Sequence, residues 1–140
     1  MKKSFLENSF KVTPIFDYIK EQAEQAGLHI HYDNGKETYQ LFLNKESYKN
    51  KEKYIGAIQY EGSNNYKNRE PHLVNWRFKR SNISNELKQE LESITSYRRD
   101  KNIGPEINPY AESISFKFEF LNEASKETIE EIIKVLRKYS

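Results

Sequence analysis

Residues 113–121 read SISFKFEFL, and this stretch decides the fold. Its large apolar side chains stand at every second position, at Ile114, Phe116, Phe118 and Phe120, with serine, lysine and glutamate between them. Successive side chains of a β-strand point to opposite faces, so this alternation predicts a strand with one buried and one solvated face. Antiparallel sheets covered by helices on a single face are built from strands of this kind.

Four more strands are predicted upstream, at about 28–32, 37–43, 54–60 and 72–79, because the same two-residue period recurs there. In the last of them, Val74, Trp76 and Phe78 share one face. Asp33, Asn34 and Gly35 predict a tight hairpin turn between the first two strands, since Asn and Gly tolerate positive φ. A short additional strand is expected at Phe5–Val12.

Three helices are predicted from capping residues and apolar spacing. The first covers 13–27, with Thr13 as cap, Pro14 in the first turn and Gly27 as the stop. The second begins after Ser84 and runs to about Tyr97 or Arg99, and the third starts near Ser125. Residues 44–53, rich in lysine and asparagine, are expected to form a loop. The prediction is a single α+β domain over residues 1–140, with a mostly antiparallel five-stranded sheet, about three helices on one face and the order α-β-β-β-β-α-β-α.

Composition narrows the function classes. The chain has 140 residues and no cysteine, which excludes disulfides, thiolate metal sites and a cysteine nucleophile. The N-terminus reaches Glu7 before an apolar segment can form, and no stretch has the roughly 20 apolar residues of a membrane span. We therefore expect a cytoplasmic protein with no membrane partner. The net charge of +2 is small for a nucleic-acid-binding domain.

The sequence contains none of the common catalytic motifs. Its five glycines are scattered singly, so it has no glycine-rich phosphate loop, and neither Gly-x-Ser-x-Gly nor His-Glu-x-x-His occurs. No cofactor is expected, and a binding role is favoured over catalysis.

Two histidines provide the first metal-site candidate. His29 and His31 are two residues apart on a predicted strand and so share a face, with Asp33 next on that face and His72 as a distant third ligand. This set would suit a metal-dependent hydrolase. The alternative, a solvated polar face, is favoured because a metal site needs three or four converging ligands and the spacing relates only two of these.

Two basic runs are candidates for nucleic-acid contact. The first comprises Arg77, Lys79 and Arg80 at the end of a strand, and the second comprises Arg98, Arg99 and Lys101 after a helix. Cations close to rings can follow a phosphate backbone while the rings stack on bases. Only a union of both runs would create a sizeable positive surface, so nucleic-acid binding is the alternative hypothesis.

Tyrosines in the predicted loops support the leading hypothesis. Tyr48, Tyr66 and Tyr110 lie among asparagines, and this combination of rigid rings and adaptable amides is typical of protein-binding surfaces. We therefore predict a small non-catalytic binding protein directed at another protein, a regulator or inhibitor of the kind encoded by bacteria or their mobile elements.

Overall fold

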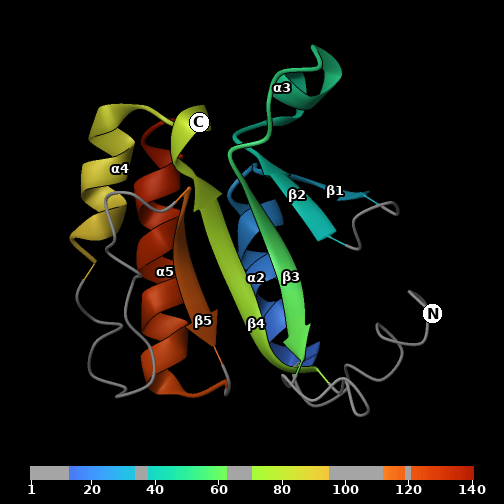
Figure 1. Cartoon of the computed structure of the whole chain (residues 1–140), viewed down its shortest axis with the longest axis vertical. Helices are drawn as coiled ribbons and strands as arrows, with labels where there is room; N and C mark the ends of the chain where they lie inside the picture. The colour runs from blue at the N-terminus through green and yellow to red at the C-terminus, as the bar shows by residue number, and fades with distance from the viewer. Residues whose placement is uncertain (1–12, 34–37, 63–70, 95–111, 119–120) are drawn as a thin grey trace.

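The computed structural model describes residues 13–33, 38–62, 71–94, 112–118 and 121–140. Within them the chain forms four α-helices, one 3-10 helix and five strands (Figure 1). The helices are α2 (Thr13–Gln25), α3 (Lys45–Lys49), η1 (Arg80–Asn82), α4 (Asn85–Glu92) and α5 (Glu123–Arg137). The strands are β1 (His29–Asp33), β2 (Thr38–Phe42), β3 (Gly56–Gly62), β4 (Pro71–Lys79) and β5 (Ser113–Phe118). The predicted α+β class is confirmed, and the predicted order of elements matches the structure apart from the short helices α3 and η1.

The five strands form one antiparallel sheet in the order β1-β2-β3-β4-β5. The pairing of β1 with β2 confirms the hairpin, although residues 34–37 of its turn lie outside the described residues. Trp76 pairs with Phe116 and Phe78 with Ile114, so the apolar positions of β4 and β5 lie side by side on one face. This register keeps every large ring of the two strands on the same side of the sheet.

Helices α2 and α5 cover that side of the sheet, and α4 packs against α5 (Figure 1). Their apolar stripes meet the sheet in a single core, in which Trp76, Phe78, Phe116 and Phe118 are fully buried. The rings of Trp76 and Phe78 lie 5.3 Å apart, and Phe78 meets Phe116 edge to face at 6.1 Å. Large rings therefore supply much of the buried surface of a chain whose hydrophobic fraction is only 36%.

Capping residues begin and end the helices largely as expected. Gly27 has a φ of 85° just after α2, and the Ser84 side chain accepts a hydrogen bond from the Leu87 amide at the start of α4. Helix α5 begins slightly earlier than predicted, at Glu123, because Asn122 and Ser125 form a reciprocal capping box.

Two predictions about residues 44–53 and α4 were wrong. The segment 44–53 contains the short helix α3 and is not wholly a loop. Helix α4 ends at Glu92, short of Tyr97, since the Ser93 hydroxyl donates to the Glu90 carbonyl and satisfies the last turn. The strand expected at Phe5–Val12 lies outside the described residues. No helix in the described ranges has the length and apolarity needed to cross a lipid bilayer.

The C-terminal end of α5 is tied to α4 through Glu90. Lys138 Nζ donates to one carboxylate oxygen at 2.7 Å, and the Tyr139 hydroxyl donates to the other. Both hydrogen bonds lower the pKa of Glu90, and the one from Lys138 has the larger effect. The hydrogen bond to Glu90 in turn raises the pKa of Tyr139 to about 12. The carboxylate therefore favours its charged form in the folded protein.

Replacing a core ring should be far more costly than replacing its exposed neighbour. We expect Phe118→Ala to lower the free energy of unfolding by about 3–5 kcal/mol, because it leaves a cavity under the sheet. Lys117→Ala should change it by less than about 0.5 kcal/mol. Urea unfolding followed by the fluorescence of Trp76, the only tryptophan, measures both values. Equally small effects would mean that β5 does not bury Phe118.

The Glu90 contacts should make stability depend on pH in a defined direction. A lowered folded-state pKa adds stability above the ordinary value of 4.5, and this contribution is lost as the pH falls through the folded-state pKa. The difference in unfolding free energy between the wild type and Glu90→Gln should therefore be largest above pH 4.5 and shrink below it. Glu52→Gln, an exposed carboxylate, is the control and should give a difference near zero throughout. A Glu90→Gln difference that does not change with pH would contradict the assignment.

Candidate binding site on the polar face of the sheet

The face of the sheet opposite α2 and α5 is polar, and we call it the polar face. It is formed by the alternate residues of each strand that point away from the helices. Several of these are small and buried, including Ala57, Asn75 and Ser115. Between them stand longer, half-exposed side chains: His29, His31, Gln40, Gln59, Arg77, Lys79 and Lys117. The face thus combines a flat floor with projecting polar groups.

One end of the polar face carries four rings in contact, which we call the ring cluster: His29, His31, Phe42 and Tyr48. The ring of Tyr48 lies 4.3 Å from that of His29, 5.0 Å from that of His31 and 5.3 Å from that of Phe42. Its hydroxyl is hydrogen-bonded to Nδ1 of His31 at 3.2 Å. Tyr48 therefore covers both histidines, and Phe42 is buried beneath it.

The ring cluster affects the charge of His29. Burial lowers the pKa of His29, and the neighbouring His31 and Lys45 lower it further. The neutral imidazole is therefore favoured beneath the Tyr48 ring. The rings of this cluster are suited to stacking against a planar partner.

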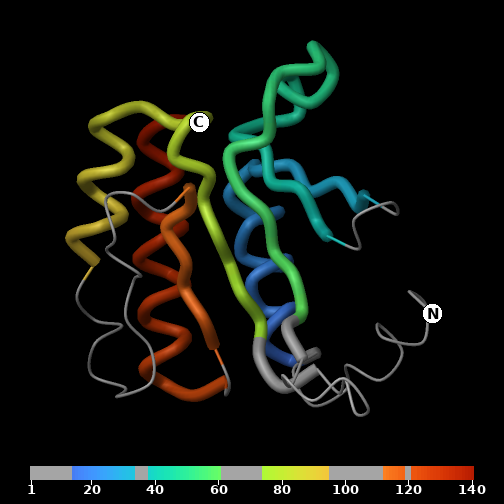
Figure 2. Tube along the Cα trace, viewed as in Figure 1, coloured from blue at the N-terminus to red at the C-terminus, as the bar shows by residue number. Residues whose placement is uncertain are grey.

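Tyr48 is held in place by the segment 44–53, which we call the α3 arm. Figure 2 shows the arm leaving β2, turning through α3 and returning to β3 at one end of the sheet. The Asn44 side chain caps α3 by accepting from the Ser47 amide at 2.8 Å. At the other end, the Glu52 amide bonds to the Ser47 carbonyl and the Lys51 amide to the Tyr48 carbonyl, which places Lys51 at a φ of 56°.

Two cations of β4, Arg77 and Lys79, project from the middle of the polar face. Gly56 lets β3 approach β4 closely beside them, since a Cβ there would lie 2.4 Å from the Arg77 carbonyl oxygen. Lys79 Nζ lies 3.3 Å from the Glu112 carboxylate and 6.0 Å from the centre of the Tyr54 ring. Among the described residues, the Arg77 side chain has no hydrogen bond or ion pair. Arg77 is therefore available to a ligand.

Arg80 differs from its two neighbours in sequence. It lies in η1, where the strand alternation has ended, and its side chain is only 13% exposed. Nη1 donates to Glu92 of α4, while Nε and Nη2 are buried without a hydrogen-bond partner. Arg80 therefore links η1 to α4 and does not belong to the exposed basic surface.

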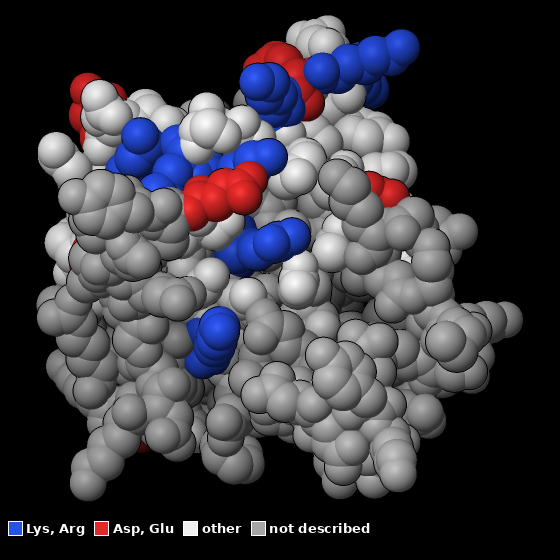
Figure 3. Space-filling view, viewed as in Figure 1, with Lys and Arg blue, Asp and Glu red and all other residues white. Residues whose placement is uncertain are grey.

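Charges are segregated between the two sides of the sheet. Acidic residues outnumber basic ones by three to one in α2, three to one in α4 and four to three in α5. The α3 arm instead carries four lysines and two glutamates, and the strands add three cations, Arg77, Lys79 and Lys117, on the polar face, against the carboxylates of Asp33 and, beside Lys79, Glu112. Figure 3 shows the lysine and arginine side chains gathered on the arm and over the sheet. The polar side is thus basic and the helical side acidic.

The remaining predicted site residues divide into two groups. Tyr66, Tyr110, Arg98, Arg99 and Lys101 lie outside the described residues. His72 lies in β4, but its side chain is also outside the described part. Asp33 accepts a hydrogen bond from Gln40 at 3.4 Å, and His31 contacts Tyr48. Within the described ranges, no group of three or more histidine, aspartate, glutamate or cysteine side chains is arranged to hold a metal ion.

Sequence reasoning missed the contribution of three features to this site. It assigned Lys117 to the solvated side of a strand, left Phe42 out of the candidates and treated the lysines of 44–53 as loop residues. The matching two-residue periods of β4 and β5 could have shown that Lys117 lies on the same face as Arg77, because both strands must turn their rings toward the helices. Comparison with protein-family models, curated proteins and solved structures finds no match to this chain.

The left-handed residue of the α3 arm offers a test of its turn. A non-glycine residue in this region costs about 1–2 kcal/mol, while glycine adds about 0.4–1 kcal/mol of unfolded-state entropy. We therefore expect Lys51→Gly to raise the free energy of unfolding by about 0.5–1 kcal/mol. The control is Lys49→Gly within α3, which should lower it by up to about 1 kcal/mol. Urea unfolding measures both variants. A lower free energy of unfolding for Lys51→Gly would contradict the left-handed conformation of Lys51.

Proposed function

We propose that this protein is a non-catalytic binding protein whose polar face contacts single-stranded nucleic acid. The observation that carries the proposal is the coexistence, on one face of one sheet, of the ring cluster with the cations Arg77, Lys79 and Lys117. A ligand that fits such a face needs planar groups and negative charge together. Unpaired bases and a phosphate backbone supply both.

The spacing of the strands supports this ligand. Neighbouring strands lie about 4.8 Å apart, so the rings on β1 and the cations on β4, three strands away, are separated by roughly 14 Å across the sheet. A short single strand lying across the sheet can meet both. The acidic helical side would repel the backbone and so orient it toward the polar face.

The hypothesis of a protein-directed regulator has less structural support. It was based on the aromatic-rich composition, the polar loops with their tyrosines and the lack of a catalytic motif, and of those tyrosines the structure describes Tyr48, in the ring cluster. Tyr66 and Tyr110 lie outside the described residues. A protein partner is therefore retained as the alternative outcome of the following experiment.

Binding to labelled single-stranded DNA and RNA of about 12 nucleotides, measured by fluorescence anisotropy, tests the proposal. The logarithm of the affinity should fall linearly with the logarithm of the salt concentration between about 50 and 200 mM, because bound cations are released from the phosphates. Arg77→Gln should weaken binding and reduce that slope by about one. Arg137→Gln, the same change on α5 at the helical side, is the matched control and should alter neither value.

The contribution of the rings is separable from that of the charges. Tyr48→Leu should weaken binding by about 1–3 kcal/mol per stacked base while leaving the salt slope unchanged. If neither oligonucleotide binds at about 50 mM salt, or if Arg77→Gln and Arg137→Gln behave alike, the proposal fails. Affinity capture of a partner that survives nuclease treatment would then favour the protein-directed alternative.

A further inference from the structure

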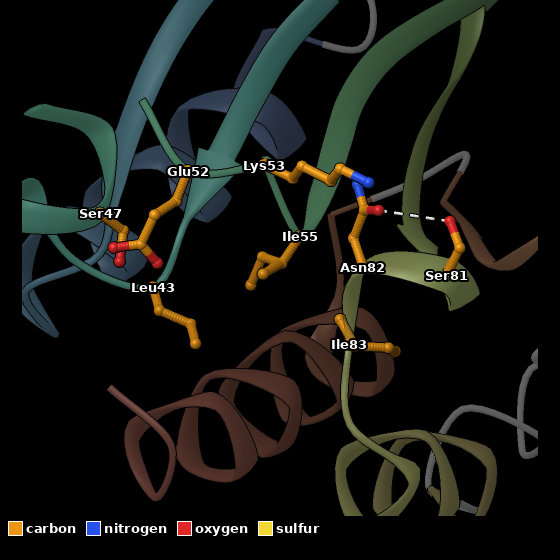
Figure 4. A pocket seen from close by; sticks show the side chains of 8 residues that line it. All are labelled: Leu43, Ser47, Glu52, Lys53, Ile55, Ser81, Asn82 and Ile83. Atoms are coloured by element: carbon orange, nitrogen blue, oxygen red, sulfur yellow. Dashed lines mark hydrogen bonds between the residues drawn. The ribbon is translucent and has the colours of Figure 1, made fainter. Parts of the chain in front are cut away.

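A second candidate site lies at the end of the sheet, on the other side of the α3 arm from the ring cluster. It is a groove of about 470 Å³ between the arm, the start of β3 and the segment around η1 (Figure 4). This volume falls within the range of pockets that bind small molecules and short peptide segments. The proposed nucleic-acid surface does not include it.

The floor of the groove is apolar. Leu43, Ile55 and Ile83 come from three different segments, and their side chains point into the same hollow (Figure 4). Ile55 belongs to the core, and the other two are half-buried hydrophobic residues packed against it. The floor is thus a partly exposed extension of the core, and one aliphatic side chain placed on it would be removed from water.

Hydrogen bonds hold the walls of the groove in position. Asn82 Nδ2 donates to the Tyr54 carbonyl at 2.7 Å, and the Ser81 hydroxyl donates to Asn82 Oδ1 at 3.2 Å. The Ile55 amide bonds to the Leu41 carbonyl at 2.8 Å, and the Ile55 carbonyl accepts from Lys79 at 2.9 Å. A groove fixed in this way requires little ordering when a ligand binds.

Opposite charges flank this apolar floor. The Glu52 side chain extends toward Ser47, whereas that of Lys53 extends across to Asn82 (Figure 4). Both residues are exposed, and neither has an ion pair with any described residue. An occupant with a cation at one end, an aliphatic group in the middle and an anion at the other end would match all three features.

We propose that this groove binds an extended peptide segment in which an aliphatic residue stands between a basic and an acidic one. The aliphatic side chain rests on Leu43, Ile55 and Ile83, the basic residue pairs with Glu52 and the acidic residue pairs with Lys53. The groove does not overlap the polar face. One molecule of this protein can therefore hold a peptide segment in the groove while its polar face contacts nucleic acid.

Blocked tripeptides, which carry only side-chain charges, test the proposal. Titration calorimetry with acetyl-Lys-Leu-Glu-amide should show binding, and acetyl-Lys-Ser-Glu-amide should bind at least about tenfold more weakly because the buried aliphatic contact is lost. Equal affinities for the two peptides, or no binding of the leucine peptide at millimolar concentration, would overturn the proposal. Neither result bears on the oligonucleotide measurements, which concern Arg77 and Tyr48.

A change of charge preference tests the orientation of the ligand. Glu52→Lys should weaken acetyl-Lys-Leu-Glu-amide and strengthen acetyl-Glu-Leu-Glu-amide, each severalfold, because the new cation replaces an anion at that end of the groove. Glu46→Lys, the same change on the α3 arm outside the groove lining, is the matched control and should alter neither affinity. Trp76 fluorescence verifies that both variants are folded. If Glu46→Lys and Glu52→Lys shift the two affinities alike, general electrostatics and not the groove determines binding, and the proposal is rejected.

Discussion

The structure depends on the burial of alternate side chains from β4 and β5 on one side of the sheet. Trp76, Phe78, Phe116 and Phe118 are fully buried there, and the register pairs Trp76 with Phe116. A slip of one residue in that register would turn one strand over, exposing its row of rings to water and bringing Arg77 or Lys117 into the core. Exposing the rings and burying a cation both cost much free energy. Hydrophobic burial therefore specifies the register and the side of the sheet on which the helices pack.

This one-sided burial also determines what the opposite face contains. Strand geometry requires that each ring facing the helices alternate with a residue facing away, so Arg77 and Lys117 are placed by the same constraint that places Phe78 and Phe116. Packing against α2 and α5 therefore does not restrict which residue types can stand on the polar face. At Gly56 the backbones of β3 and β4 approach so closely that a side chain there would collide with the Arg77 carbonyl oxygen.

Sequence patterns predicted the features that are local or periodic. The five strands, α2 with its Gly27 stop and the Ser84 cap of α4 all follow from alternation or capping rules that operate within a few residues. The α3 arm was missed because a five-residue helix has too few positions for an apolar stripe. Arg80 was grouped with Arg77 and Lys79 because it directly follows the end of the predicted strand, whereas η1 turns its side chain toward Glu92.

The ring cluster could not have been predicted, since it joins segments whose proximity depends on the tertiary fold. His29 and His31 were related to each other by strand spacing and Tyr48 was identified separately, but only the path of the α3 arm places Tyr48 over both imidazoles. The chemical interpretation changed with that contact. From spacing alone, the two histidines were a metal-ligand candidate or, as favoured, part of a solvated polar face, whereas under the Tyr48 ring they form an aromatic surface.

Net charge is a poor guide to the surface electrostatics of this protein for a related reason. A formal charge of +2 averages over the whole chain and suggests an almost neutral protein. The fold separates the charges, because the amphipathic helices carry their acidic residues on one side of the sheet while the α3 arm and the strands carry lysine and arginine on the other. A ligand at the surface responds to the local potential within about 10 Å at moderate salt, and not to the sum over the molecule. The choice of partner therefore depends on how charge is distributed between the two sides of the sheet, and not on the net charge of the chain.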